Sequence, residues 1–319
     1  MDHPELITIF GGSGFVGTQV VQLLARAGYR IRVAVRRPDL AGHVKPLGNV
    51  GQVVPIQANV RNKESVAAAV RGASVVINLA AIGIEKGRQR FRAVNVMGAR
   101  NVAEAAKLAG VQTLVQMSVL GADERSQSLF ARSRALGEAE VRSVFPSAII
   151  FRPSVIFGVG DSFFNTIGSL TRVLPVMPLF GGETKFQPAY VGDVAEAIAE
   201  AAKGNARAGT TYELGGPEIL SNHELTELVL RYTNRRNPIL PLPLGVGTLL
   251  SIPMGLMPKP LLTADRVRLL GIDNVVSEAA IADRRTLQGF GIIPRPLDAV
   301  LPSYLWRFSQ NGQFDRQTA

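Results

Sequence analysis

The stretch 6–28, LITIFGGSGFVGTQVVQLLARAG, decides the fold of this chain. A mostly apolar run leads directly into a glycine-rich segment, and an amphipathic run follows that ends at Gly28. This order predicts a buried strand, a tight turn and a helix. Gly11, Gly14 and Gly17 have the spacing G-x-x-G-x-x-G, which lets the backbone turn tightly, approach a pyrophosphate and pack the helix on the strand.

The strand–turn–helix context favours a dinucleotide site over a purely structural glycine turn. The first turn of such a helix presents free N–H groups and the positive end of the helix dipole to an anion. We therefore expect the cofactor phosphates to lie against the residues of this turn, namely Gly11, Ser13, Gly14, Phe15, Val16 and Gly17.

Further apolar strands follow, separated by helical segments. Alternation of this kind predicts a parallel sheet with helices on both faces, that is, an α/β Rossmann-type doubly wound fold. Asn62 is the predicted N-cap of a short helix that ends before Gly72, and residues 88–109 are expected to be helical. The predicted strands lie within 31–37, 51–60, 74–82, 113–119 and 147–153.

After Ser154 the pattern becomes irregular, with proline and glycine clusters and shorter helices near 192–204, 221–235 and 297–308. This part predicts a smaller, mostly helical C-terminal domain. We expect the dinucleotide-binding domain to span 1–157, with 187–204 returning to it. The smaller domain is then formed by 158–186 and 205–319.

The second predicted strand ends in two arginines instead of an acidic residue. Arg36 and Arg37 suit the 2′-phosphate of NADP(H), through charge-assisted hydrogen bonds, better than the free ribose hydroxyl of NAD(H). Two solvated arginines at a strand end are the alternative. The ends of the third and fourth strands are expected to contact the adenine and the cofactor backbone through Asn59, Val60, Ala80 and Ala81.

The composition limits the partners. Lys and Arg number 35 against 25 Asp and Glu, a net charge of +10 that favours an anionic partner. The chain has no cysteine and only three histidines, which are far apart, so we expect no disulfide and no metal site. Basic runs with interleaved aromatics are absent, so we expect no nucleic-acid partner. The N-terminus lacks a signal-peptide pattern, and we expect a cytoplasmic location.

The stretch 128–140, SLFARSRALGEAE, resembles a helix of the short-chain dehydrogenase/reductases without its chemistry. Active relatives have a tyrosine that exchanges the substrate proton and a lysine one turn later that lowers its pKa. Phe130 and Arg134 occupy those two positions here. Phe130 has no hydroxyl, so we expect no catalytic residue at this position. Tyr190 is the one other tyrosine in a segment expected to return to the cleft, and packing is its simpler interpretation.

Nearly the whole chain resembles the extended and atypical short-chain dehydrogenase/reductases. More narrowly, it resembles the NADPH-binding accessory subunits of respiratory complex I, in a bacterial version. The motifs that carry this resemblance include "FGGSGFVG", "FRAVNVMGARNVAEAAK", "FQPAYVGDVAEAI", "YELGGPE" and, most specifically, the stretch 134–165.

The resemblance implies tight binding of NADP(H) without turnover, in a peripheral subunit at the junction of the two arms of the complex. Its partners would be other complex I subunits and the anionic cytoplasmic face of the inner membrane. Ser118, Arg134, Pro153 and Ser154 would line the nicotinamide end. Relatives often keep Tyr and Lys at positions 130 and 134, so their absence here supports a non-catalytic role.

The stretch 238–262, PILPLPLGVGTLLSIPMGLMPKPLL, has Lys259 as its single charge. Its six prolines interrupt any helix long enough to span a bilayer, so we expect it to pack on lipid, on a membrane subunit, over a quinone entrance, or as a wall of the small domain. Arg266 and Arg268 follow closely and suit headgroups or an acidic partner.

Two other functions fit the same residues. One is a free-standing NADP-dependent reductase, epimerase or dehydratase acting on a sugar nucleotide or a small carbonyl. The other is a regulatory protein that binds NADPH and changes partners. Phe130 and Arg134 favour the accessory subunit over the enzyme.

Overall fold

The computed structural model describes residues 5–254, 260, 262–310 and 312, and the chain divides into two compact units. Unit 1 comprises Met1–Pro153, Val191–Leu214 and Ser277–Ile293. Unit 2 comprises Ser154–Tyr190, Gly215–Val276 and Pro294–Ala319.

Unit 1 is built on a seven-stranded parallel sheet with the strand order β11-β6-β5-β4-β1-β2-β3. The order reverses between β1 and β4, which is the arrangement of the predicted doubly wound fold. The strands are β1 (Leu6–Phe10), β2 (Arg30–Val35), β3 (Val53–Gln57), β4 (Val75–Asn78), β5 (Thr113–Met117), β6 (Ile149–Pro153) and β11 (Thr211–Leu214).

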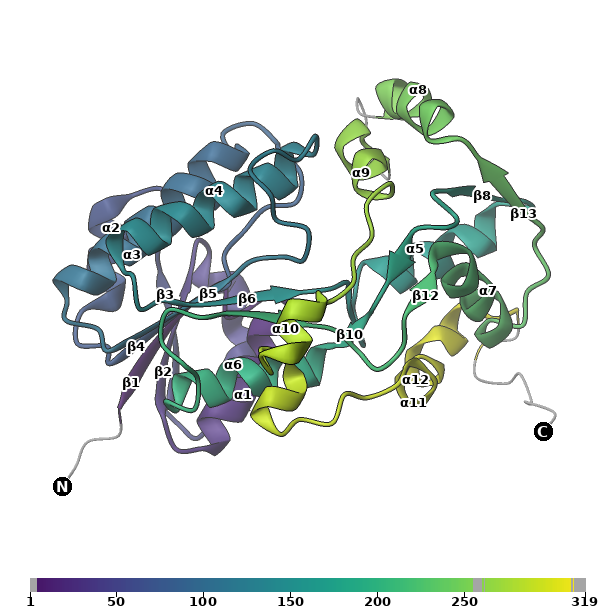
Figure 1. Cartoon of the computed structure of the whole chain (residues 1–319). Helices are drawn as coiled ribbons and strands as arrows, with labels where there is room; N and C mark the ends of the chain where they lie inside the picture. The colour runs from purple at the N-terminus through teal and green to yellow at the C-terminus, as the bar shows by residue number, and fades with distance from the viewer. Residues whose placement is uncertain (1–4, 255–259, 261, 311, 313–319) are drawn as a thin grey trace. The chain divides into compact units, whose positions relative to one another are not determined.

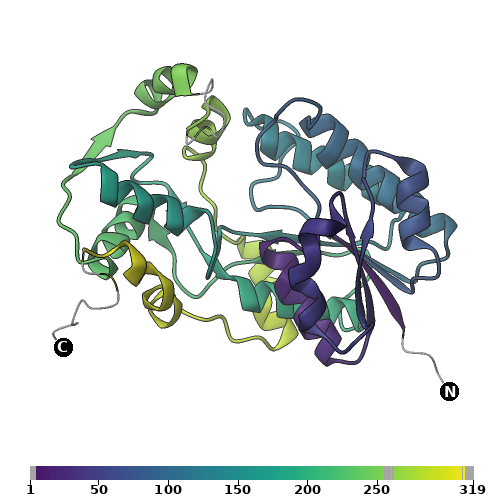
Figure 2. The ribbon, with the colours of Figure 1, turned by 180° about the vertical axis from the view of Figure 1, so that it is seen from behind.

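Helices cover both faces of this sheet. Figures 1 and 2 show α2, α3 and α4 on one face and α1 and α6 on the other. The helices are α1 (Phe15–Arg26), α2 (Lys63–Val70), α3 (Met97–Leu108), α4 (Leu129–Val144), α6 (Val191–Ala202) and α10 (Glu278–Ala282), with single-turn or irregular segments η1 (Pro38–Leu47), η2 (Arg92–Val96) and η3 (Leu287–Phe290).

The core explains why the central strands are apolar on both sides. Ile7, Ile9, Val33, Val76 and Ile77 are fully buried, since helices lie above and below them. Local signals set the helix ends. Asn62 accepts a hydrogen bond from the Ser65 N–H at 2.6 Å, as the sequence predicts for an N-cap. Gly28 and Gly72 have positive φ after their helices.

Unit 2 combines short helices with two-stranded pairings. β10 pairs with β7, β12 with β9, and β13 with β8. The elements are β7 (Ile156–Phe157), α5 (Phe163–Val173), β8 (Met177–Phe180), β9 (Lys185–Phe186), β10 (Ala189–Tyr190), β12 (Leu220–Ser221), α7 (Asn222–Tyr232), β13 (Ile239–Leu242), α8 (Leu244–Met254), α9 (Ala264–Leu269), α11 (Leu297–Val300), α12 (Pro302–Leu305) and η4 (Trp306–Phe308).

The fold class expected from the sequence is confirmed, and some local details differ. The segment 205–214, expected in the smaller domain, lies in unit 1 because β11 pairs with β6. The segment 277–293 also lies in unit 1. There the Arg285 carbonyl accepts the Glu213 N–H, and the Arg285 guanidinium donates to the Thr211 carbonyl of β11. The helix expected over 88–109 begins with a π-helical turn, Arg92–Val96, before α3.

The apolar stretch 238–262 forms β13 and then α8, and Lys259 lies outside the described residues. Across the part of the chain that the structure describes, no helix combines the length and the apolar character that crossing a bilayer requires.

Candidate functional site

The glycine-rich turn joins β1 to α1 at the sheet edge where the strand order reverses. Gly11 has φ +76°, a conformation that side chains disfavour, and its carbonyl accepts the Gly14 N–H at 3.0 Å. A Cβ on Gly17 would lie 2.4 Å from the Gly11 oxygen and 2.6 Å from the Gly12 Cα. The turn and the helix therefore pack too closely for any residue except glycine at position 17.

The first turn of α1 suits an anion. Gly14 is the N-cap residue and supplies no side-chain cap, and the first turn carries no acidic residue. Its N–H groups and the positive end of the helix dipole are therefore not neutralised by a side chain of this helix. The imidazole Nε2 of His43 lies 3.2 Å from the Ser13 carbonyl oxygen and ties η1 to the turn.

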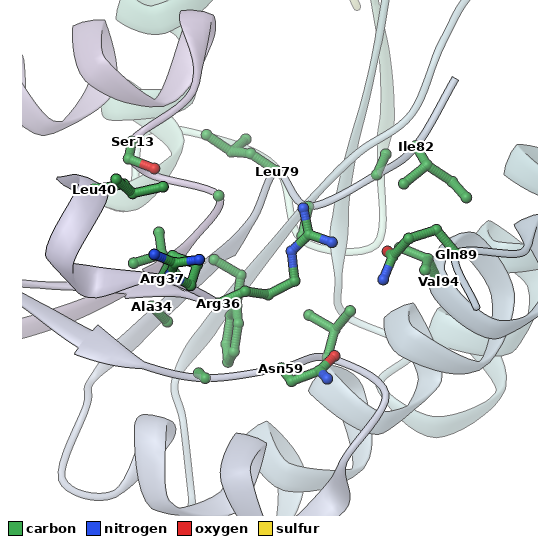
Figure 3. A pocket seen from close by; sticks show the side chains of 17 residues that line it. Ser13, Ala34, Arg36, Arg37, Leu40, Asn59, Leu79, Ile82, Gln89 and Val94 are labelled. Carbon is green, nitrogen blue, oxygen red and sulfur yellow. The ribbon is translucent and has the colours of Figure 1, made fainter. Parts of the chain in front are cut away.

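A cavity of about 640 Å³ adjoins this turn, at the carboxyl ends of β1, β2, β3 and β4 (Figure 3). Its volume is in the range of small-molecule and cofactor sites. Eight residues predicted from the sequence line it, and they are Gly11, Ser13, Arg36, Arg37, Asn59, Val60, Ala80 and Ala81. The remaining predicted phosphate-contacting residues, Gly14, Phe15, Val16 and Gly17, follow directly in the turn and the start of α1.

The two arginines of this cavity differ in their surroundings. Figure 3 shows the Arg36 side chain extending into the middle of the pocket, between Leu79 and Asn59, whereas Arg37 lies beside Leu40. Arg37 makes a 2.7 Å salt bridge to Asp39, and this carboxylate raises the pKa of the Arg37 guanidinium. A second hollow, of about 510 Å³, is lined by Arg36, Asn59, Asn62 and Ser65. Arg36 thus contributes to both hollows.

The strand ends that form the floor of the cavity are held by buried amides. Asn78 donates to the Gln116 side chain at 2.8 Å and accepts from the Ala80 N–H at 3.2 Å. The Asn59 N–H donates to the Ser65 hydroxyl at 2.8 Å. These bonds fix the backbone beside the cavity independently of any ligand.

The residues expected at the nicotinamide end do not line this cavity in the described part of the chain. Ser118 lies after β5, is 1% exposed, and donates its hydroxyl to Glu138. The Pro153 carbonyl accepts the Leu120 N–H at 2.9 Å. Ser154, in unit 2, donates to the Asn274 side chain at 2.7 Å. Their contact with a cofactor stays a prediction.

Arg134 is buried in unit 1. Its Nη2 donates to the Met117 carbonyl, and its Nε has no hydrogen-bond partner among the described residues. Burial lowers the pKa of the Arg134 guanidinium to about 10, partly opposed by the negative charge of Glu138. One donor of this buried cation is therefore left for an acceptor that the described residues do not supply.

The position of the missing acid is apolar. The Phe130 ring packs against Phe91, with ring centroids 6.0 Å apart. Tyr190, the other tyrosine considered from the sequence, lies in unit 2, where its ring packs 5.7 Å from Phe157 and Arg295 stacks over it at 4.9 Å. Within the described residues, no group of three or more acidic, histidine or cysteine side chains is placed to hold a metal ion.

Sequence reasoning missed several residues of these sites. Leu40, Leu79, Ile82, Gln89 and Val94 line the cavity, yet no local pattern indicates any of them as a cofactor contact. Glu138 and Arg152 were also missed. Glu138 lies on α4 and contacts Arg152 of β6 and Ser118 after β5, and no local sequence pattern indicates that these three residues meet.

Comparison with known proteins adds three relatives. The family model "RmlD substrate binding domain" matches residues 5–245. The chain is 33% identical, over 96% of its length and 78% of the relative, to NADH dehydrogenase [ubiquinone] 1 alpha subcomplex subunit 9, mitochondrial, of Arabidopsis thaliana. The same-named subunit of Mus musculus is 37% identical over 91% of this chain and 77% of its own. A ceramide reductase of Caulobacter vibrioides is 34% identical over 61% of this chain and 60% of its own.

Solved structures share the fold. The dTDP-4-dehydrorhamnose reductase of Bacillus anthracis, in complex with NADP, is similar with a TM-score of 0.59 and 20% identity. The match covers 76% of this chain and 86% of that one. At this identity the likeness supports the architecture and nothing finer.

Proposed function

This chain belongs to the RmlD substrate binding domain family and to the family of complex I alpha subcomplex subunit 9, and from that premise we propose that it is a non-catalytic, NADP(H)-binding accessory subunit of respiratory complex I. The observation that carries the proposal is identity of 33–37% over more than nine-tenths of the chain to proteins named as complex I subunits.

The residues fit a nicotinamide dinucleotide. The glycine turn leaves no room for a Cβ at Gly17, the first turn of α1 lacks a capping side chain, and the adjoining cavity is of cofactor size. In this proposal the pyrophosphate lies against the N–H groups of the turn, and Asn59 and Val60 contact the adenine.

The 2′-phosphate is assigned to Arg36 rather than Arg37. Arg36 extends into the cavity and also borders the neighbouring hollow with Asn62 and Ser65. Arg37 is already paired with Asp39, so recruiting it would require breaking that ion pair. A guanidinium beside the ribose favours NADP(H) over NAD(H) through charge-assisted hydrogen bonds.

At the nicotinamide end we assign Arg134 to a ribose hydroxyl, because its buried Nε lacks a hydrogen-bond partner in the described part of the chain. NADPH supplies a hydride when a substrate and a proton donor are present. Phe130 has no proton to give, and the Ser118 hydroxyl is engaged by Glu138. In this proposal the cofactor is therefore held without a proton donor at position 130 or 118.

We place the protein on the cytoplasmic face of the bacterial inner membrane, as a peripheral partner of other complex I subunits near the junction of the two arms. The apolar segment β13–α8 supports this location. Leu249 is 68% and Leu250 44% exposed in α8, which contains no charged residue. Arg266 and Arg268 follow on α9 and suit anionic headgroups.

The test is purification of a tagged chain from gently solubilised membranes. The protein is expected to co-migrate with complex I subunits, to resist a moderate salt wash, and to release NADP(H) on denaturation. Salt weakens attraction to lipid alone, whereas a packed protein interface persists. Recovery in the soluble fraction without respiratory subunits would reject the accessory role.

The similarity to a ceramide reductase favours a second candidate, an NADP-dependent reductase of a lipid-linked or other small carbonyl. The two candidates differ in turnover. Loss of a general acid lowers a rate by about 10²–10⁴-fold, so the accessory subunit should show no NADPH consumption above background with ketone or sugar-nucleotide substrates. Turnover on the order of 1 s⁻¹ or faster would instead identify an enzyme that uses another proton donor.

A further inference from the structure

Unit 2 carries its own concentration of positive charge. Two hollows, of about 440 and 540 Å³, share Arg235, Arg236 and Asn237. The first is also lined by Arg172 and the second by Arg231. Four arginines thus line these two hollows, and we call the pair the arginine hollow.

The fold holds the arginine hollow in place. Arg172 lies in the last turn of α5 and Arg231 in the last turn of α7. The Asn237 amide donates to the Thr171 carbonyl at 3.0 Å and to the Leu174 carbonyl at 2.5 Å, which ties the segments after the two helices together. The Nε of Arg235 donates to the Phe308 carbonyl at 2.7 Å.

The hollow carries more positive charge than stabilisation of its two helix C-termini explains. A cation in the last turn stabilises a helix through its dipole, which accounts for Arg172 and Arg231. Arg235 and Arg236 lie beyond the end of α7, after a turn in which Asn234 adopts φ +50°. Glu227 is the only carboxylate among the described residues that line the hollow, and it lies 3.8 Å from the His223 Nδ1. A net positive charge therefore remains.

Exposed apolar side chains accompany these arginines: Val173 lines the first hollow, Val176 directly precedes β8, and Leu240 lies in β13. Val173 is 78%, Val176 40% and Leu240 50% exposed. β13 leads from the hollow directly into α8 with its exposed leucines (Figure 1). Arginines interleaved with exposed aliphatic residues suit a bilayer surface, where guanidinium groups meet phosphates and aliphatic side chains enter the acyl boundary. An acidic protein face would satisfy the arginines but not this apolar rim.

We propose that the arginine hollow binds the phosphodiester headgroups of anionic phospholipids and docks unit 2 on a bilayer. The inference concerns unit 2 and requires neither NADP(H) nor complex I. Its failure would therefore leave the proposed function standing, and loss of the proposed function would leave the lipid site standing.

The experiment measures co-sedimentation of the full chain with vesicles of phosphatidylcholine alone or of equimolar phosphatidylcholine and phosphatidylglycerol. The triple variant R172Q/R231Q/R236Q removes three charges from the hollow. It keeps Arg235, because the Arg235 Nε donates a hydrogen bond to the Phe308 carbonyl. The matched control, R26Q/R71Q/R125Q, removes the same charge from exposed arginines of unit 1. Thermal unfolding at wild-type temperature shows that each variant is folded.

The wild type should bind the anionic vesicles and not the neutral ones. The hollow variant should bind roughly 100-fold more weakly, which corresponds to about 1 kcal/mol per arginine near the surface, and the control should change by less than about fivefold. Equal losses in both variants would show diffuse attraction and overturn the site. Absence of wild-type binding would overturn it in favour of an acidic protein face.

Two further arms separate the sources of phosphate and the role of the rim. Inorganic phosphate, at matched ionic strength, should not displace the protein, and displacement would assign the hollow to a free phosphate instead. The variant V173S/V176S/L240S should weaken vesicle binding in high salt, where the aliphatic contribution dominates. Unchanged binding in high salt would contradict docking of the apolar rim.

Discussion

Ser118 donates its hydroxyl hydrogen bond to Glu138, four residues after Arg134 on α4. The same carboxylate receives the Arg152 guanidinium in two bonds, Nε to Oε1 at 2.9 Å and Nη2 to Oε2 at 2.7 Å. Glu138 is 5% exposed, so it is a nearly buried charge that depends on both partners. The Ser118 hydroxyl is therefore part of a buried network of hydrogen bonds.

The network predicts a large loss of stability for Glu138→Ala. Removing one partner of a buried ion pair leaves the other charge uncompensated, which costs about 3–5 kcal/mol, and partial exposure of Arg152 reduces this to about 2–4 kcal/mol. The control is Glu140→Ala, two residues away, whose carboxylate pairs with Arg100 at the surface and is worth about 0–1 kcal/mol. Urea unfolding measures both, and equal losses would contradict the buried role of Glu138.

The assignment of the 2′-phosphate predicts that the two neighbouring arginines are unequal. Arg36→Ala should cost about 1.5–3 kcal/mol of NADP(H) binding, or roughly 10–100-fold in Kd, and leave NAD(H) binding almost unchanged. Arg37→Ala should change either affinity by less than about threefold, because Arg37 is paired with Asp39. Titration calorimetry with both cofactors measures the four values. Equal losses for NADP(H) and NAD(H) would contradict a phosphate contact.

The glycine turn predicts that Gly17→Ala prevents stable cofactor binding. The new Cβ would lie 2.4 Å from the Gly11 carbonyl oxygen, so α1 must move away from the turn that we propose binds the phosphates. Gly42→Ala is the control, since a Cβ there meets nothing within 4 Å and should be neutral or stabilise slightly by restricting the unfolded chain. Thermal shift with and without NADP(H) reports both effects. A Gly17→Ala protein that keeps the ligand-induced shift would show that the close approach is not required.

The glycine turn and the cavity beside it were predictable because their signals are local. The spacing of Gly11, Gly14 and Gly17 specifies a turn, and strand ends follow from runs of apolar residues. The predicted residues at the ends of β2, β3 and β4 do line one cavity. Parallel strands bring their carboxyl ends to one edge, so distant sequence segments meet there without any further information.

Features that depend on tertiary pairing were not predictable. Glu138 reads as a solvated helix residue, and only the pairing of β5 with β6 brings Ser118 and Arg152 to it. The return of 205–214 as β11 has no local signature that distinguishes it from a strand of the smaller domain. The structure of the proline-rich stretch 238–262 was also ambiguous, because prolines argue against a strand in the middle of a sheet. Among the described strands, β13 pairs only with β8, and prolines are tolerated in such an edge strand.

The burial of Arg134 predicts opposite effects on stability and on cofactor binding. With its pKa lowered by burial to about 10, the charged guanidinium costs the folded state on the order of 3 kcal/mol at neutral pH. This cost is fully present below about pH 10, and it declines as the pH rises further, because the folded protein releases the proton before the unfolded chain does. Functional sites commonly retain such unfavourable groups.

Arg134→Met keeps the aliphatic stem and removes the charge, while Glu138 retains Arg152 and Ser118. Without cofactor, the variant should therefore be as stable as the wild type or more stable by about 1–2 kcal/mol, the lost bond to Met117 offsetting part of the gain. Its affinity for NADP(H) should fall about tenfold. Arg132→Met is the control, because Arg132 donates to the Ser126 carbonyl at 2.7 Å and should lose about 1 kcal/mol without a change in affinity. Urea unfolding and calorimetry separate the two effects, and an Arg134→Met protein that is less stable yet binds NADP(H) normally would show that Arg134 is a structural residue and not a ligand of the cofactor.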